Sequence, residues 1–143
     1  MLLLDANLLI YAYHTESEEH AAAKAWVEGA FSGAEAVGLP WQTILAFLRI
    51  TTHQRIFERP LSMNKAQGIA ASWLERPQVH PVEAGANFFS VLSGLLKPAQ
   101  IKGALVSDAA IAALAIEHGA TLCTTDRDFA RFAGLKWVNP LRA

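Results

Sequence analysis

The sequence of 143 residues has one cysteine, few charges and no long apolar run, and each shortage excludes a class of protein. The single cysteine, Cys123, excludes an internal disulfide, and its apolar neighbours predict a buried structural thiol. Charged residues make up only 17% and hydrophobic residues 52%, which is too apolar for a disordered chain. Asp5 interrupts the apolar start, and no stretch approaches the roughly 20 residues that span a bilayer. We therefore expect no signal peptide, no membrane association and a cytoplasmic location.

The acidic and basic residues nearly cancel, with 13 acids against 12 bases, but they are unevenly distributed. Residues 1–35 hold six acids and one base, whereas residues 36–143 hold seven acids and eleven bases. A pI near 6.5 argues against a protein that coats nucleic acid non-specifically. Arg49, Arg55 and Arg59, with His53 between them, form a basic patch that can approach a phosphate backbone, although an ordinary solvated helix face explains it as well.

The chain has no repeat, no low-complexity tract and no linker, which predicts one domain over residues 1–143. Apolar runs and helical periodicities alternate along it. Strands are expected at 2–4, 36–39, 78–80, 121–124 and 136–138, and helices between Thr15 and Gly33 and at 41–53, 64–74, 84–96, 108–118 and 126–132. Thr15 and Glu18 have the spacing of a capping box, and Ser107 is expected to cap the helix that begins at Asp108. This alternation favours an α/β fold with a central parallel sheet and helices on both faces.

Acidic residues stand where the predicted strands end. Asp5 follows the first strand, Asp126 and Asp128 follow the strand at 121–124, and Asp108 opens the buried helix before that strand. Ligand sites in open parallel sheets lie beyond the carboxyl ends of the strands, so these acids are expected to meet. Their mutual repulsion favours a bound cation, and hard oxygen ligands select Mg²⁺ or Mn²⁺. The scattered histidines and the lone cysteine give no zinc spacing.

A purely structural explanation exists for each acid separately. Asp5 can cap a helix starting at Ala6, Asp108 can favour a helix N-terminus, and Asp126 can cap the turn before Arg127. A metal site explains all three acids at once and is the preferred interpretation. Asn7, Thr124 and Thr125 can orient the ligands, although ordinary turn hydrogen bonding accounts for them equally well.

Acidic motifs stand at 4–11, 106–115 and 124–129, and further characteristic segments are Leu-Pro-Trp at 39–41, Phe-Leu-Arg at 47–49 and Asn-Pro-Leu at 139–141. Taken together and in this order, these motifs resemble the PIN domain, and in particular the VapC-type ribonuclease toxins. The resemblance covers essentially the whole chain. It implies a PIN-like three-layer sandwich and an endoribonuclease dependent on Mg²⁺ or Mn²⁺. It also implies a homodimer and a cognate antitoxin protein that blocks the site.

By this resemblance, Asp5, Asp108 and Asp126 match the catalytic, metal-binding acids, and Asp128 matches an additional acid. One position departs from the pattern, because Phe47 stands where many PIN domains have a glutamate. No acid lies between Glu35 and Glu58, which predicts a weaker second metal or a single well-held ion. Thr43, one helical turn earlier, is a candidate substitute.

The predicted reaction is hydrolysis of an RNA phosphodiester by water activated at a metal, with the carboxylates as ligands. Arg49 and Arg55 are candidate RNA-binding residues, with surface solvation or antitoxin binding as the alternative. The departure at Phe47 leaves open a catalytically weak or inactive PIN-like module that binds RNA or protein. A haloacid-dehalogenase-like phosphatase is disfavoured because it needs an acid where Asn7 stands, and a nuclease for structured DNA because the chain lacks the insertions of those larger relatives.

Overall fold

Five parallel strands form the centre of the computed structural model, which describes residues 1–98 and 100–142. The last residue of the expected domain, Ala143, lies outside the described residues. The strands are β1 (Leu2–Leu4), β2 (Val37–Pro40), β3 (Val79–Val82), β4 (Thr121–Cys123) and β5 (Trp137–Val138), in the order β3-β2-β1-β4-β5. β1 is central and pairs with β2 and β4, with Leu3 opposite Gly38 on one side and Leu122 on the other. The first and fourth strands, which the acidic motifs follow, are therefore neighbours.

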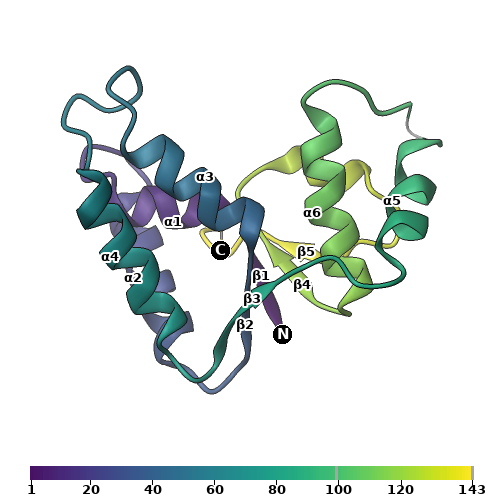
Figure 1. Cartoon of the computed structure of the whole chain (residues 1–143), viewed down its shortest axis with the longest axis horizontal. Coiled ribbons are helices and arrows are strands. Elements are labelled where there is room, and N and C mark those ends of the chain that lie inside the picture. The colour runs from purple at the N-terminus through teal and green to yellow at the C-terminus, as the bar shows by residue number, and fades with distance from the viewer. Residues whose placement is uncertain (99, 143) are drawn as a thin grey trace.

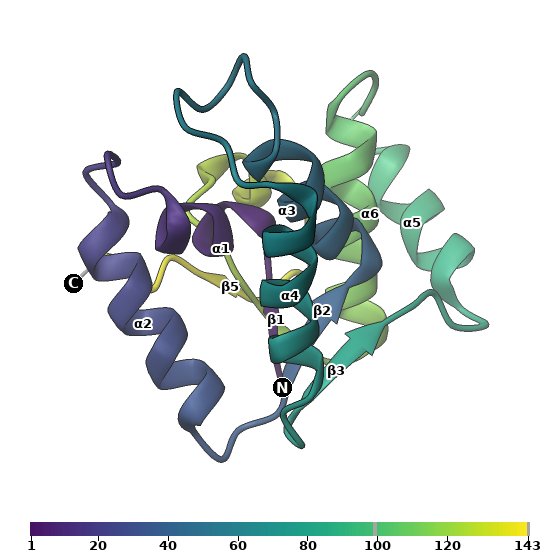
Figure 2. The ribbon, with the colours of Figure 1, turned by 60° about the vertical axis from the view of Figure 1, so that its left-hand side comes forward.

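Helices cover both faces of this sheet (Figures 1 and 2). Helices α1 (Ala6–Tyr13), α2 (His20–Ser32), α3 (Trp41–Thr51) and α4 (Met63–Leu74) lie on one side, and α5 (Phe88–Leu96) and α6 (Leu105–Glu117) on the other. A short 3₁₀ helix, η1 (Arg127–Arg131), follows β4. Successive strand side chains point to opposite faces, so Leu4 packs in the core under α1–α4 and Leu3 in the core under α5 and α6. The predicted three-layer α/β architecture is confirmed.

Two predicted helix caps are wrong. Thr15 and Glu18 do not cap α2, which begins at His20; its N-cap is Glu19, whose own N–H donates to the Ser17 hydroxyl at 3.1 Å. Helix α6 begins at Leu105, so Ser107 lies in its first turn and is not its cap. The earlier start follows a turn at Gly103, which has a φ of +66° and whose carbonyl accepts from the N–H of Val106.

Two further elements differ from the expected pattern. Residues 6–13 form α1. The sequence indicated this helix only as one that Asp5 could cap. Helix α5 begins at Phe88, not at Ala84, because the Glu117 carboxylate accepts from the backbone N–H groups of Gly85 and Asn87 at 2.8 and 3.0 Å. These bonds hold the preceding residues in a turn. None of the helices in the described ranges is long and apolar enough to cross a membrane.

Candidate active site

Asp5 is positioned by the end of β1 and the start of α1. Its backbone N–H donates to the Cys123 carbonyl at 3.0 Å, which extends the pairing of β1 with β4 by one residue. Its Oδ1 accepts from the N–H of Ala6 at 2.8 Å and thereby caps α1. The capping role foreseen for Asp5 is therefore real, and it leaves Oδ2 for other partners.

Those partners come from the residue that follows β4 and from the first turn of α1. The buried hydroxyl of Thr124 donates to Asp5 Oδ2 at 2.8 Å and accepts from the N–H of Asp126 at 3.0 Å. The Asn7 amide donates to Asp5 Oδ2 at 3.3 Å and to the Thr124 hydroxyl at 3.2 Å. The N–H of Thr125 donates to Asn7 Oδ1 at 3.4 Å. The structure thus joins Asn7, Thr124 and Thr125 into one network around Asp5.

Asp126 and Asp128 lie at the start of η1. Asp126 caps this 3₁₀ helix by accepting from the N–H of Asp128 at 2.8 Å. Asp128 is exposed, and its carboxylate forms an ion pair with Arg131 at 3.5 Å. Arg131 did not emerge from the sequence, although its spacing of three residues from Asp128 was available as a signal.

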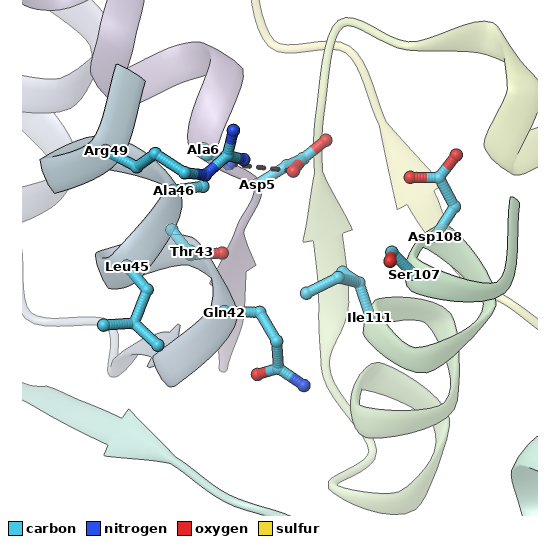
Figure 3. A pocket seen from close by; sticks show the side chains of 10 residues that line it. All are labelled: Asp5, Ala6, Gln42, Thr43, Leu45, Ala46, Arg49, Ser107, Asp108 and Ile111. Atoms are coloured by element: carbon cyan, nitrogen blue, oxygen red, sulfur yellow. Dashed lines mark hydrogen bonds between the residues drawn. The ribbon is translucent and has the colours of Figure 1, made fainter. Parts of the chain in front are cut away.

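A cleft of about 370 Å³ opens in front of Asp5 (Figure 3). Asp5 lies on one side of the cleft, next to α3, and Asp108 on α6 lies across the opening. The lining residues are Asp5, Ala6, Gln42, Thr43, Leu45, Ala46, Arg49, Ser107, Asp108 and Ile111. The cleft therefore combines two acids that lie 103 positions apart with a basic side chain from α3.

The acids influence one another electrostatically. Burial, reinforced by the carboxylates of Asp126, Asp5 and Asp128, raises the pKa of Asp108 from 3.8 to about 6, although Arg131 opposes the rise. Burial likewise raises the pKa of Asp5, with a contribution from Asp126, while the hydrogen bonds from Thr124 and Ala6 act in the opposite direction. The four aspartates named from the sequence therefore share one electrostatic site.

The donor set of this site fits a hard divalent cation in its chemistry, because it consists of carboxylate, hydroxyl and amide oxygens. Concentrated negative charge at half-buried positions is also what a cation would relieve. Within residues 1–98 and 100–142, however, no three histidine, cysteine or acidic side chains converge closely enough to hold an ion. The carboxylates surround the site without yet forming a coordination shell.

The face that α3 presents to the cleft corrects one expectation. Phe47 does not point toward the acids; it is fully buried, and its ring packs against Trp73 with centroids 4.7 Å apart. Ala46 lines the cleft in its place, because adjacent residues on a helix point in directions about 100° apart. An acid on α3 that faces Asp5 would therefore stand at position 46. As the sequence already shows, α3 itself contains no acidic residue.

The remaining candidates fall into different places. Thr43 lines the cleft, but its hydroxyl donates to the Leu4 carbonyl at 2.8 Å, so it ties α3 to the end of β1. Arg49 lines the cleft and forms no ion pair with the described acids. Arg55 is exposed in the segment after α3 and does not line the cleft. Gln42, which was not predicted from the sequence, lines the cleft.

Cys123, whose backbone carbonyl accepts from the Asp5 N–H, has a buried thiol. Burial, with a smaller contribution from Glu35, raises its pKa to about 12. The burial agrees with the expectation of a buried structural thiol, and a raised pKa disfavours the reactive thiolate.

Comparison with known proteins places this architecture in a family. The PIN-domain family model matches residues 2–135. Ribonuclease VapC37 of Mycobacterium tuberculosis is 40% identical over 140 residues, which cover 98% of this chain and 97% of that protein. Ribonuclease VapC33 of the same species is 37% identical over 142 residues, which cover 99% of each.

Solved structures agree in fold. VapBC2 from Rickettsia felis, crystallised with a promoter DNA fragment, matches with a TM-score of 0.68 at 17% identity, covering 96% of this chain and 97% of that one. VapC20 of Mycobacterium tuberculosis, a toxin that cleaves the sarcin-ricin loop, matches with a TM-score of 0.65 at 16% identity, covering 94% and 96%. The chain therefore belongs to the PIN-domain family and, within it, to the VapC type.

Proposed function

We propose that this chain is the endoribonuclease toxin of a toxin–antitoxin pair and that it hydrolyses RNA phosphodiester bonds. The observation that carries the proposal is the gathering of Asp5, Asp108 and Asp126 at one end of the sheet, where the carboxylate of Asp126 helps to raise the pKa of both Asp5 and Asp108. A cleft open to solvent adjoins them, as access for a polymer requires. The similar proteins VapC37 and VapC33 are named ribonucleases, which supports the same chemistry here.

Asp5, Asp108 and Asp126 would hold Mg²⁺ or Mn²⁺ as the catalytic acids, with Asp128 as an additional ligand. The ion pair with Arg131 engages Oδ1 of Asp128. Such a cation, when bound, lowers the pKa of a water molecule and offsets negative charge that develops on the phosphate. The carboxylates act as ligands and not as nucleophiles.

The chain's own polar side chains keep these acids in place. Thr124 and Asn7 both donate to Asp5. The hydrogen bond from Thr124 favours the ionised form of Asp5 against the effect of burial on its pKa. Thr125 restrains Asn7, and Thr43 fastens α3 to the carbonyl that precedes Asp5. We assign these four residues a positioning role.

RNA is held by positive charge at the cleft. Arg49 extends from α3 toward Asp5 (Figure 3) and is placed to contact a phosphate beside the acids. Arg55 stands outside the cleft and would contact the backbone further along the strand. Contacts of this kind position RNA without reading its sequence.

We further propose that residues 1–143 act as one domain, as a homodimer, in the cytoplasm and under control of a cognate antitoxin protein. Structures similar in fold include VapBC toxin–antitoxin complexes from Rickettsia felis and Haemophilus influenzae, which supports the antitoxin partner. An antitoxin that covers the cleft would block RNA and the cation together.

The test is cleavage of total cellular RNA by purified protein free of antitoxin, with Mg²⁺, with Mn²⁺ and with EDTA. We expect cleavage that requires the cation and is lost in Asp5→Asn. Glu75→Gln, which removes an exposed carboxylate at the end of α4, is the control and should cleave like the wild type.

A second function is favoured by one observation, the lack of an acid on the cleft-facing side of α3, where Ala46 stands. In that case the chain is a catalytically weak PIN-like module that binds RNA or a partner protein. Absence of cleavage with either cation, from a folded protein that still binds RNA, would support this alternative.

A further inference from the structure

A second cavity lies next to the acidic site, on the side of the C-terminal segment. Its volume is about 310 Å³, at the lower end of the range usual for pockets that hold small ligands. The segment after β5 forms one wall, and α1 and the start of α2 form the other. The lining residues are Tyr11, Glu19, Thr125, Asn139, Leu141 and Arg142.

This cavity is connected to the acids through a single residue. Thr125 lines it and immediately precedes Asp126. The N–H of Thr125 donates to Asn7, whose amide in turn donates to Asp5. A nucleotide adjacent to a phosphate at the acids is therefore the part of a bound RNA strand that would reach this cavity.

Glu19 supplies an oriented hydrogen-bond acceptor in the cavity. The Ser17 hydroxyl donates to its Oε2 at 2.6 Å, which fixes the carboxylate and lowers its pKa. Glu19 is therefore ionised at neutral pH, and a carboxylate has several further acceptor positions. It suits a ligand with two adjacent N–H donors.

The opposite wall supplies donors. Asn139 Oδ1 accepts from the N–H of Leu141 at 3.0 Å, which leaves the amide NH₂ as the donor end of that side chain. Arg142 adds a guanidinium group, and the half-buried Tyr11 adds an aromatic surface for stacking. The cavity thus places an ionised acceptor, amide and guanidinium donors, and a ring around one space.

Among the RNA bases, guanine matches this arrangement. Its N1–H and N2 amino group are adjacent donors, and its O6 and N7 are acceptors. Adenine has an acceptor at N1 and would face the Glu19 carboxylate with unfavourable lone pairs. Sequence-specific recognition of RNA acts mostly on unpaired bases, which are stacked on aromatic side chains and hydrogen-bonded along their edges.

We propose that this cavity is a guanine-binding subsite, in which Glu19 accepts from the Watson–Crick edge of an unpaired guanosine next to the scissile phosphate. The proposal rests on the ribonuclease function proposed above and adds base selection to it. Glu19 becomes the residue that determines specificity, and Tyr11 supports the base by stacking.

The first experiment measures binding without catalysis. The mononucleotides GMP, IMP and AMP are titrated into the protein in the presence of EDTA, and binding is followed by NMR. GMP should bind roughly tenfold more tightly than AMP, since a bidentate base contact is worth about that factor or more. IMP, which keeps N1–H but lacks the N2 amino group, should lie between them.

Glu19→Gln should reduce the preference for GMP over AMP to less than about twofold. Glu18→Gln is the matched control, because Glu18 is the exposed preceding residue and does not line the cavity. Equal binding of GMP and AMP by the wild type would overturn the proposal, and so would an unchanged preference in Glu19→Gln. A variant that keeps nucleotide preference but loses affinity for a co-produced antitoxin would also overturn it, in favour of a protein-docking surface.

A second experiment separates this subsite from the ribonuclease function. Short RNAs carrying guanosine, inosine or adenosine at the position next to the cut are compared by kcat/KM. Guanosine preference in cleavage that disappears in Glu19→Gln supports both proposals. GMP-selective binding without any cleavage supports the subsite and counts against the ribonuclease function. Cleavage without base preference supports the ribonuclease function and counts against the subsite.

Discussion

The hydroxyl of Thr124 donates a 2.8 Å hydrogen bond to Oδ2 of Asp5, a residue 119 positions away in the chain. The same hydroxyl oxygen accepts from the N–H of Asp126. One buried side chain thus connects the acid that follows β1 with the acid that follows β4. The pairing of these two neighbouring strands makes the connection possible, because it aligns their carboxyl ends.

Replacing Thr124 by valine should impair both stability and activity. Valine keeps the shape of the side chain but leaves Asp5 Oδ2 and the Asp126 N–H without this partner. We expect a loss of about 1–3 kcal/mol in the free energy of unfolding, the usual cost of an unsatisfied buried polar group. Thr124→Ser restores the hydroxyl and should recover most of the RNA cleavage. Urea denaturation and cleavage assays measure the two effects, and wild-type activity in Thr124→Val would contradict the positioning role.

The raised pKa of Asp108 predicts that the metal-free protein is less stable at neutral pH than at mildly acidic pH. The folded protein keeps the Asp108 proton up to about pH 6, whereas the unfolded chain releases it near 3.8. The folded state therefore binds more protons over this interval, and its stability falls as the pH rises through it. Thermal unfolding in EDTA at a series of pH values measures the effect.

Asp108→Asn should remove this pH dependence and raise the melting temperature at about pH 7.5, while abolishing RNA cleavage. Near pH 4 the variant and the wild type should melt at similar temperatures, since Asp108 is then protonated. Mg²⁺ should stabilise the wild type more at about pH 7.5 than at pH 5, because protons compete for the ligand oxygens. A melting temperature of Asp108→Asn below that of the wild type at neutral pH would contradict this account.

Two glutamate substitutions on α3 should behave in opposite ways. Phe47→Glu places an unpaired carboxylate among buried aromatic rings and should prevent stable folding. Ala46→Glu adds a carboxylate to the wall of the cleft and should leave a folded protein that binds Mn²⁺ more tightly than the wild type. Circular dichroism and Mn²⁺ titration distinguish them. A folded Phe47→Glu with tighter Mn²⁺ binding would show that position 47 faces the site.

Arg49 is predicted to contribute one phosphate contact. Arg49→Ala should weaken binding of single-stranded RNA and reduce the slope of log Kd against log salt concentration by about 0.7. Asp5→Asn can be present in both proteins to prevent cleavage during the measurement. Lys65→Ala, an exposed basic residue on α4, serves as the control. An unchanged salt slope in the Arg49 variant would assign this arginine to another role.

Much of the fold could be predicted from local patterns. The strands β1 and β4 are short apolar runs because they are buried on both faces of the sheet, and the run of small apolar residues in α6 follows from its burial against the sheet. Helix starts were harder to predict. The beginning of α5 depends on Glu117, and that of α6 on the turn at Gly103, so neither is encoded in the local capping pattern alone.

Some features of the candidate site could likewise be predicted from local sequence, and others could not. The sequence by itself determined which acids follow strands, because an acid directly after an apolar run is visible in one dimension. It also determined that α3 carries no acid. Only the tertiary structure decided that Ala46 and not Phe47 faces the cleft, and that Thr124 bridges Asp5 and Asp126. These relationships depend on helix rotation and on the register between strands distant in sequence, which packing of the whole core fixes.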